Sequence, residues 1–237
     1  MRWGKSLAVL LGAALLLWLR AGHATQDNHS VSENGQGASH IQHILVFGDS
    51  LSAEYGLPRG SGWVSLIEQR LADRDQAYQI RNASISGDTT VNGLQRLPAI
   101  LAEFDADIVI LQLGANDGLR GLPVREMKNN LRQMIKLSLD HGAEVLLLGQ
   151  HIPPNYGQRY ASSFHSAFGE VAEETGSRLV PFMLEGIATD NTMFQPDGLH
   201  PTVEAQAHIA QTVWQYLEPM LQTAPQAQAA SPQHQGS

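Results

Sequence analysis

The first candidate for chemistry is a serine at the end of a short apolar run. Residues Ile44 to Ser52 read ILVFGDSLS, in which four apolar residues break into Gly48-Asp49-Ser50. If the apolar run is a strand, Ser50 lies at its carboxyl end and ahead of a helix, where the first backbone N–H groups lack partners. Ser50 is then a turn serine, a helix-capping serine or a nucleophile. The chain has no Gly-x-Ser-x-Gly pentapeptide, so a nucleophile elbow of that kind is excluded.

Two further loops offer donors for a negatively charged group. ASISGDTT follows a second apolar run, and its Gly87 lets the backbone approach a ligand closely and offer an N–H to an anion. GANDG follows a third run, and its Asn116 presents a neutral side-chain donor. Each loop has an ordinary alternative, because Asp88 or Thr89 can cap a helix and a turn asparagine usually bonds its own backbone.

A fourth loop, DGLHP, places a carboxylate three residues before a histidine. Asp197 can turn back onto the imidazole of His200, fix its tautomer and stabilise the imidazolium that forms during catalysis. The rival interpretation is a metal pair, but it lacks a third ligand at a recognisable spacing, so we expect no metal. The histidines weighed for that role are His40, His43, His141, His151, His165 and His208.

Together the four loops carry the groups that acyl transfer requires. The reaction needs a nucleophile, a base, an acid that orients the base and donors for the oxyanion, and each comes here from a loop at the end of a strand. Each signal is weak alone, and the combination favours a hydrolase.

The elements that must position these loops alternate between short apolar β-rich runs and longer segments of helical period. This pattern predicts an α/β fold in which helices cover both faces of a parallel sheet, with ligands bound outside the carboxyl ends of the strands. The expected strands are Ile44 to Phe47, Tyr78 to Ala83, Ile108 to Leu113, Val145 to Leu148 and Leu179 to Val180.

Between and after the strands, apolar stripes predict five helices that pack on the sheet and carry no chemistry. In the second of these, Pro98 is expected to kink or shorten the helix. The stripes are Trp63, Ile67 and Leu71; Val91, Leu94 and Leu97; Met127, Leu131, Met134 and Ile135; Phe164, Phe168 and Val171; and Ile209, Val213, Trp214 and Leu217.

The N-terminus has the pattern of a signal peptide. Arg2 and Lys5 precede an unbroken apolar run of 13 residues, Leu7 to Leu19, which is short for a membrane span. Small residues before Ala24 favour cleavage after it, and an uncleaved anchor is the alternative. We therefore expect an exported, periplasmic protein with no stable membrane insertion after cleavage.

Composition excludes several classes of protein. The chain has no cysteine, so it has neither disulfides nor a thiolate nucleophile. Cleavage would remove three of the 15 basic residues and none of the 23 acidic ones, which leaves a net charge of −11. Such a charge argues against nucleic acid as a partner and favours solubility.

Polar composition separates the two ends from one central domain. Residues 25–40 and 222–237 cannot bury enough apolar surface to order themselves, so we expect both to be flexible. Residues 41–221 contain no internal repeat and no linker, and form one expected domain.

The four blocks GDSLS, SISGDTT, GANDGLRG and DGLHP resemble those of the SGNH or GDSL hydrolases. Longer segments, NASISGDTT, LGANDGLRG, PPNYGQRY and DGLHP, are similar to the bacterial exported esterases described as thioesterase, protease and lysophospholipase in one enzyme. The resemblance covers most of the central domain. It implies a flavodoxin-like three-layer α/β/α sandwich with a five-stranded parallel sheet, no cofactor, a small-molecule acyl ester or thioester substrate and a monomer.

The resemblance also implies roles for individual residues. Ser50 would be the nucleophile, His200 the general base and acid, and Asp197 the orienting acid. The oxyanion would be held by the backbone N–H groups of Ser50 and Gly87 and by the side-chain amide of Asn116.

Four residues are expected to bind the acyl group by resemblance alone. Leu119 and Pro123 follow the third strand, and Pro123 is a departure that would stiffen a loop that moves in this family. Pro153 and Tyr156 follow the fourth strand as another wall of the acyl site. A carbohydrate O-acetylesterase of the same fold and a non-catalytic exported binding protein are the alternative functions.

Overall fold

The structure, a computed structural model, describes residues 41–74 and 77–221. The signal peptide expected over residues 1–24 and the flexible segments expected over 25–40 and 222–237 lie outside these ranges. Within the described ranges, no helix combines the length and the apolar character needed to cross a bilayer.

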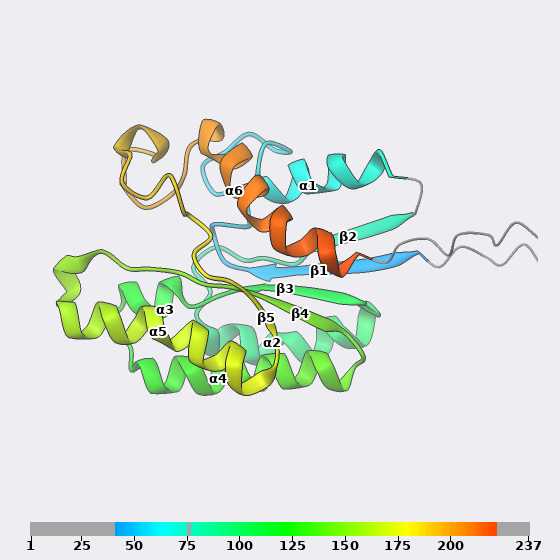
Figure 1. Cartoon of the computed structure of the whole chain (residues 1–237), viewed down its shortest axis with the longest axis horizontal. Helices are drawn as coiled ribbons and strands as arrows, with labels where there is room; N and C mark the ends of the chain where they lie inside the picture. Colours follow the sequence, from blue (N-terminus) through cyan, green and yellow to red (C-terminus); the bar gives the residue numbers. More distant parts are fainter. Residues whose placement is uncertain (1–40, 75–76, 222–237) are drawn as a thin grey trace, which may run out of the picture. The chain divides into compact units, whose positions relative to one another are not determined.

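The described residues form one parallel sheet of five strands in the order β2-β1-β3-β4-β5 (Figure 1). The chain runs from β1 outward to β2 and then returns past β1 to β3, so its direction reverses between β1 and β3. Ligands of α/β sheets bind at such a switch point, outside the carboxyl ends of the strands. The strands are β1 Gln42–Gly48, β2 Tyr78–Asn82, β3 Ile108–Gln112, β4 Glu144–Leu148 and β5 Arg178–Val180.

Helices cover both faces of the sheet, as Figure 1 shows. On one face lie α1 (Trp63–Ala72) and α6 (Val203–Leu217), and on the other lie α2 (Thr90–Glu103), α4 (Val124–Asp140) and α5 (Gln158–Thr175). The remaining helical segments are α3 Ala115–Leu119, η1 Pro154–Tyr156, η2 Asn191–Met193 and η3 Glu218–Met220.

Side-chain alternation along the strands builds two apolar layers. Leu45 and Phe47 of β1 join the layer under α2, α4 and α5, whereas Ile44 and Val46 join the layer under α1 and α6. A strand covered on both faces is apolar over most of its length, which is why residues 44–47 of β1 and 108–111 of β3 read as continuous apolar runs. The predicted three-layer α/β/α sandwich is confirmed.

The five predicted strands are also confirmed, with ends that shift by at most two residues. β1 begins at Gln42 because its ladder with β2 continues into polar residues, where Gln42 pairs with Tyr78. Four predicted helical stripes, those of α1, α4, α5 and α6, are buried throughout.

The prediction of which residues of α2 are buried is partly wrong. Val91 is 43% exposed, and the buried face includes Thr90, Gly93 and Leu97. A side chain at Gly93 would meet Leu113, because an added Cβ would lie 2.3 Å from it, so the helix packs close to the sheet there. The helix also continues through Pro98 to Glu103 and is not shortened by it.

Two local predictions around the loops need correction. No helix begins directly after Ser50, because the chain makes turns through residues 49–57 and α1 begins only at Trp63. The turn expected at GANDG is the short helix α3, which begins after Gly114. The positive φ of 124° at Gly114 is a conformation that only glycine adopts readily.

Candidate active site

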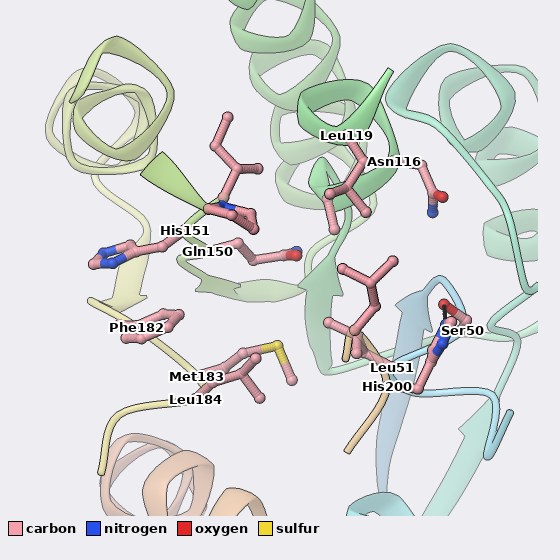
Figure 2. A pocket seen from close by; sticks show the side chains of 14 residues that line it. Ser50, Leu51, Asn116, Leu119, Gln150, His151, Phe182, Met183, Leu184 and His200 are labelled. Atoms are coloured by element: carbon pink, nitrogen blue, oxygen red, sulfur yellow. Dashed lines mark hydrogen bonds between the residues drawn. The ribbon is translucent and has the colours of Figure 1, made fainter. Parts of the chain in front are cut away.

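Ser50, His200 and Asp197 form a hydrogen-bonded chain at the carboxyl edge of the sheet. The Oγ of Ser50, just beyond β1, lies 2.9 Å from Nε2 of His200. Nδ1 of the same imidazole lies 2.6 Å from Oδ2 of Asp197. Figure 2 shows the bond between Ser50 and His200 beside the cavity. The structure thus brings Ser50 into contact with a histidine that lies 150 positions later in the chain.

The loop before α6 fixes the carboxylate that faces the imidazole. Oδ1 of Asp197 accepts hydrogen bonds from the backbone N–H groups of Leu199 and His200, at 2.9 and 3.0 Å. Burial raises the pKa of Asp197, but these bonds and the one from the imidazole outweigh burial and lower the pKa to about 2. Asp197 is therefore an anion at any physiological pH and can hold the Nδ1–H tautomer of His200.

Two further contacts hold the imidazole in place. The carbonyl of His200 accepts a hydrogen bond of 2.7 Å from the N–H of Gln195. The ring of Tyr55 lies against the imidazole with 4.4 Å between the ring centroids. Both the backbone and the ring of His200 are therefore held in place, with Nε2 facing Ser50.

The predicted oxyanion donors come from three separate segments, two loops and the short helix α3. Within the described residues, the backbone N–H groups of Ser50 and Gly87 make no hydrogen bond. Gly87 has a φ of 84°, and its carbonyl accepts a hydrogen bond from Arg120 at 2.9 Å. Nδ2 of Asn116 donates to the carbonyl of Asp88 at 2.9 Å, and in Figure 2 its amide lies on the same side of the cavity as Ser50.

A buried carboxylate lies directly behind these donors. Asp49 has no exposed surface, and its Oδ1 accepts hydrogen bonds from the N–H of Leu51 at 3.1 Å and from Nε2 of Gln112 at 2.9 Å. Its Oδ2 lies 3.3 Å from Nδ2 of Asn116. Burial raises the pKa of Asp49 to about 6, against the effect of these hydrogen bonds. Asp49 therefore links the turn after β1, the end of β3 and the side chain of Asn116.

Arg96 of α2 ties the first two loops together. Its guanidinium pairs with Asp88 at 2.6 Å and donates to the carbonyls of Ala83 at 2.6 Å and Gly48 at 3.3 Å. It also lies over the ring of Phe47, with 3.9 Å from Cζ to the ring centroid. One side chain thus sets the spacing between the turn of Ser50 and the loop of Gly87.

A second carboxylate fastens α3 to α2. Both oxygens of Asp117 accept hydrogen bonds from Thr90, from its N–H at 2.8 Å and from its hydroxyl at 2.6 Å. Burial raises the pKa of Asp117 above its ordinary value. Because Asn116 precedes Asp117, this contact also holds the helix that carries the amide donor.

An apolar cavity of about 160 Å³ opens beside Ser50 (Figure 2). An engineered protein cavity of about 150 Å³ holds a benzene molecule, so this space suits a short acyl chain or one aromatic ring. Its lining comprises Ser50, Leu51, Ala115, Asn116, Leu119, Gln150, His151, Ile152, Pro153, Phe182, Met183, Leu184, Leu199 and His200.

The four residues expected to bind the acyl group separate into two pairs. Leu119 and Pro153 line the cavity. Pro123 and Tyr156 instead line a neighbouring depression at the start of α4 and α5. The Tyr156 hydroxyl donates to the carbonyl of Leu119 at 3.0 Å, so its contact with the cavity passes through the backbone of α3.

Several residues of the site could not be identified from the sequence motifs. Asp49 lies inside the GDS motif, yet its burial depends on Gln112, 63 residues later. Gln150 and the segment from Phe182 to Leu184 line the cavity without belonging to any motif. Their position directly after β4 and β5 is the one signal that could have found them, because ligands bind at the ends of parallel strands.

The geometry supports nucleophilic catalysis. An imidazole at 2.9 Å can take the proton of the Ser50 hydroxyl as it attacks, and a carboxylate on the far nitrogen stabilises the resulting cation. In residues 41–74 and 77–221, no group of three or more histidine, aspartate or glutamate side chains is arranged to hold a metal ion.

A sequence profile described as the GDSL-like Lipase/Acylhydrolase family matches residues 46–208. The chain belongs to this family. It is 48% identical over 180 residues to "Esterase TesA" of Pseudomonas aeruginosa, an alignment that covers 76% of this chain and 90% of that protein. It is 36% identical over 178 residues to "Thioesterase 1/protease 1/lysophospholipase L1" of Escherichia coli, with 75% of this chain and 84% of that protein covered.

A solved structure of the family agrees with the fold. The crystal structure of TesA superposes with a TM-score of 0.74 at 48% identity and covers 76% of this chain and all of that chain. The GDSL family membership and these esterase relatives identify the chain as a serine esterase that acts on small-molecule esters.

Proposed function

We propose that Ser50 is the nucleophile of a two-step acyl transfer from carboxylic esters and thioesters to water. Oγ of Ser50 attacks the carbonyl carbon while His200 takes its proton, and the alcohol or thiol leaves with that proton. Water then attacks the acyl-enzyme while His200 takes a proton from it, and His200 returns that proton to Oγ of Ser50 as the acyl bond breaks and the acid is released. The observation that carries the proposal is the hydrogen-bonded chain from Asp197 through His200 to Ser50.

The negative charge on the carbonyl oxygen is stabilised by donors fixed before the substrate arrives. We assign this role to the N–H groups of Ser50 and Gly87 and to Nδ2 of Asn116. The unbonded state of the two N–H groups supports the assignment, since donors without partners need no reorganisation during the reaction.

The cavity favours substrates with a short acyl chain or an aryl group. A second hollow of about 310 Å³ shares His151, Phe182 and Leu184 with the cavity and extends toward Phe194 and Ala188. Longer acyl chains have room along this second hollow. The relatives named as thioesterase and lysophospholipase support acyl-CoA and lysophospholipids as further substrates.

Labelling of Ser50 tests the proposal directly. A fluorophosphonate should modify the mature protein at one site per molecule, and Ser50→Ala should abolish both labelling and hydrolysis of p-nitrophenyl butyrate. Ser162→Ala, an exposed serine on α5, is the control and should keep both. Labelling that persists in Ser50→Ala, or an unlabelled but active enzyme, would refute the assignment.

A series of acyl lengths then separates the esterase from its alternative. We expect p-nitrophenyl butyrate to decanoate and palmitoyl-CoA to be hydrolysed. A carbohydrate O-acetylesterase would act on acetate and fail on the longer chains, and a binding protein would hydrolyse none of them.

We also propose that the protein is exported and acts in the periplasm as a monomer. The support is the N-terminal pattern of two basic residues and 13 apolar ones. Expression of the full chain in a bacterial host, followed by fractionation and mass measurement, should find a periplasmic product that begins at Thr25. A cytoplasmic product that keeps Met1 would contradict export, and size-exclusion chromatography with light scattering tests the monomer.

A further inference from the structure

Gln150 places a primary amide in the wall of the apolar cavity. The residue lies just beyond β4 and is 3% exposed. Figure 2 shows its side chain extending into the cavity, toward the side where Leu119, Leu51 and Ser50 lie. A ligand that enters the cavity therefore meets the amide of Gln150.

The backbone holds Gln150 in a fixed position. Gly149 donates its N–H to Val180 at 2.8 Å, and its carbonyl accepts from the N–H of Met183 at 3.0 Å. A Cβ on Gly149 would lie 2.2 Å from the carbonyl oxygen of Pro181, so the two strands meet closely there. The next residue, His151, stacks on Phe182 with 3.9 Å between ring centroids. Gln150 thus has little freedom to turn out of the cavity.

The amide of Gln150 is not used by the fold. Its Nε2 is buried and makes no hydrogen bond within the described residues. Two glutamines that are as deeply buried behave differently. Gln112 bonds Asp49 and Ser52 through both ends of its amide, and Gln206 bonds the N–H of Trp63 and the carbonyl of Thr202. Buried amides normally find such partners, so an unused one calls for a partner from elsewhere.

No side chain of the cavity wall bonds Nε2 of Gln150 in the part of the chain that the structure describes. The neighbouring lining residues Leu51, Leu119, Ile152 and Met183 are apolar. A purely hydrocarbon chain in the cavity leaves this amide unpaired. An enzyme site that hydrogen-bonds a polar group of its substrate discriminates against a substrate analogue that lacks this group.

We propose that Gln150 selects acyl groups that carry a hydrogen-bonding oxygen along the chain, such as hydroxyacyl or ether-containing acyl esters. This inference rests on the proposed function, since it places the acyl group of the ester bound at Ser50 in the cavity. The two ends of the amide exchange by rotation about χ3, so it can donate to an ether oxygen or bond a hydroxyl group.

The test compares acyl groups of equal length with one leaving group. The substrates are p-nitrophenyl hexanoate, its two analogues in which an ether oxygen replaces the methylene at position 4 or 5, and the 3-hydroxy analogue, each corrected for its rate of alkaline hydrolysis. For the wild-type enzyme we expect kcat/KM to be about tenfold higher for at least one oxygen position than for hexanoate, the size of one buried hydrogen bond. Equal kcat/KM at every position would overturn the proposal without any variant.

Gln150→Met removes the amide and keeps the length of the side chain. We expect the variant to reverse the preference, with higher kcat/KM on hexanoate and lower kcat/KM on the favoured oxygenated ester. Met183→Leu, a buried apolar substitution in the same wall, is the control and should change both substrates by similar factors. A Gln150→Met enzyme that keeps the wild-type preference would refute the proposal.

The outcomes distinguish this inference from the proposed function. Wild-type enzyme that hydrolyses hexanoate and is labelled at Ser50, but shows no oxygen preference, refutes the selection by Gln150 alone. Enzyme that hydrolyses none of the esters refutes the esterase assignment and the selection with it.

Discussion

Replacing Asp49 with asparagine tests whether a buried carboxylate positions the side-chain donor of the oxyanion hole. Asparagine can keep an oxygen at the Oδ1 position, where it would still accept from Leu51 and Gln112. The NH₂ group of the new side chain would then replace Oδ2, the oxygen that lies 3.3 Å from Nδ2 of Asn116 in the wild type. Two donors would face each other, and the amide of Asn116 must move.

The expected loss of activity follows from what the displaced amide contributes. Complete removal of one oxyanion donor costs about 10² to 10³ in kcat, and Asp49→Asn displaces the donor without removing it, so we expect a fall of about 10 to 10². KM should change little, because the ground-state carbonyl gains less from the donor than the oxyanion does. The measurement is kcat and KM on p-nitrophenyl butyrate.

The same substitution should also change how stability depends on pH. Burial raises the pKa of Asp49 from 3.8 to about 6, so the folded state holds the proton more tightly than the unfolded chain does. Stability from this group is therefore fully present below pH 3.8 and is lost as the pH rises through about 6. A shift of roughly two units corresponds to about 3 kcal/mol, or about 6 to 12 °C in Tm for a domain of this size.

Thermal unfolding of both proteins between about pH 4 and pH 8 measures that slope. The wild-type Tm should fall relative to that of Asp49→Asn as the pH rises. Ser52→Ala, which removes the hydroxyl bonded to Gln112 at 2.6 Å, is the control and should lower Tm at every pH with little effect on kcat. A constant difference in Tm between the wild type and Asp49→Asn, together with an unchanged kcat, would refute the role of Asp49.

Three further variants test the remaining parts of the site. Asn116→Ala should lower kcat on aryl esters by about 10² to 10³ with KM nearly unchanged, and a wild-type kcat would remove Asn116 from the oxyanion hole. Asp197→Asn should lower kcat by about 10⁴, because the imidazole loses the partner that sets its tautomer; a fall of less than tenfold in steady-state assays would contradict that role. Arg96→Met leaves Asp88 buried without its partner and should cost about 3 to 5 kcal/mol in urea unfolding, whereas a midpoint within error of the wild type would show that the pair does not hold the loops.

The sheet could be predicted because burial on both faces leaves a simple pattern in the sequence. β3 is buried at all five positions, and its first four residues, 108–111, form an unbroken apolar run before Gln112. The buried face of α2 could not be predicted in the same way. Its contact with the sheet depends on Gly93, which has no side chain to mark it, and on Thr90, which is buried because Asp117 bonds it.

The residues proposed for catalysis could be predicted from the sequence for a different reason. Ser50, Asn116 and His200 each follow or precede an element in a short loop, and their chemical types are recognisable without knowledge of their contacts. Asp49 and Arg96 are not recognisable in this way, because an aspartate in a turn and an arginine on a helix usually face solvent. Their roles arise only when the fold joins segments that are up to 67 residues apart.

Two buried polar side chains lie near the proposed nucleophile, because Asp49 precedes Ser50 and Gln150 lines the same cavity, and the difference between them distinguishes the proposed catalytic role from the proposed recognition role. Asp49 has partners on both oxygens, and its bonds fix groups that must not move when charge develops on the substrate. Gln150 is about as deeply buried, yet it bonds nothing in the described protein. A buried polar group without a partner weakens the fold, so its persistence in the wall of an active-site cavity favours a use that the folded protein alone does not reveal. Substrate preference should therefore respond to Gln150 while kcat on a simple aryl ester responds to Asp49, and measuring both variants on both kinds of ester separates the two roles.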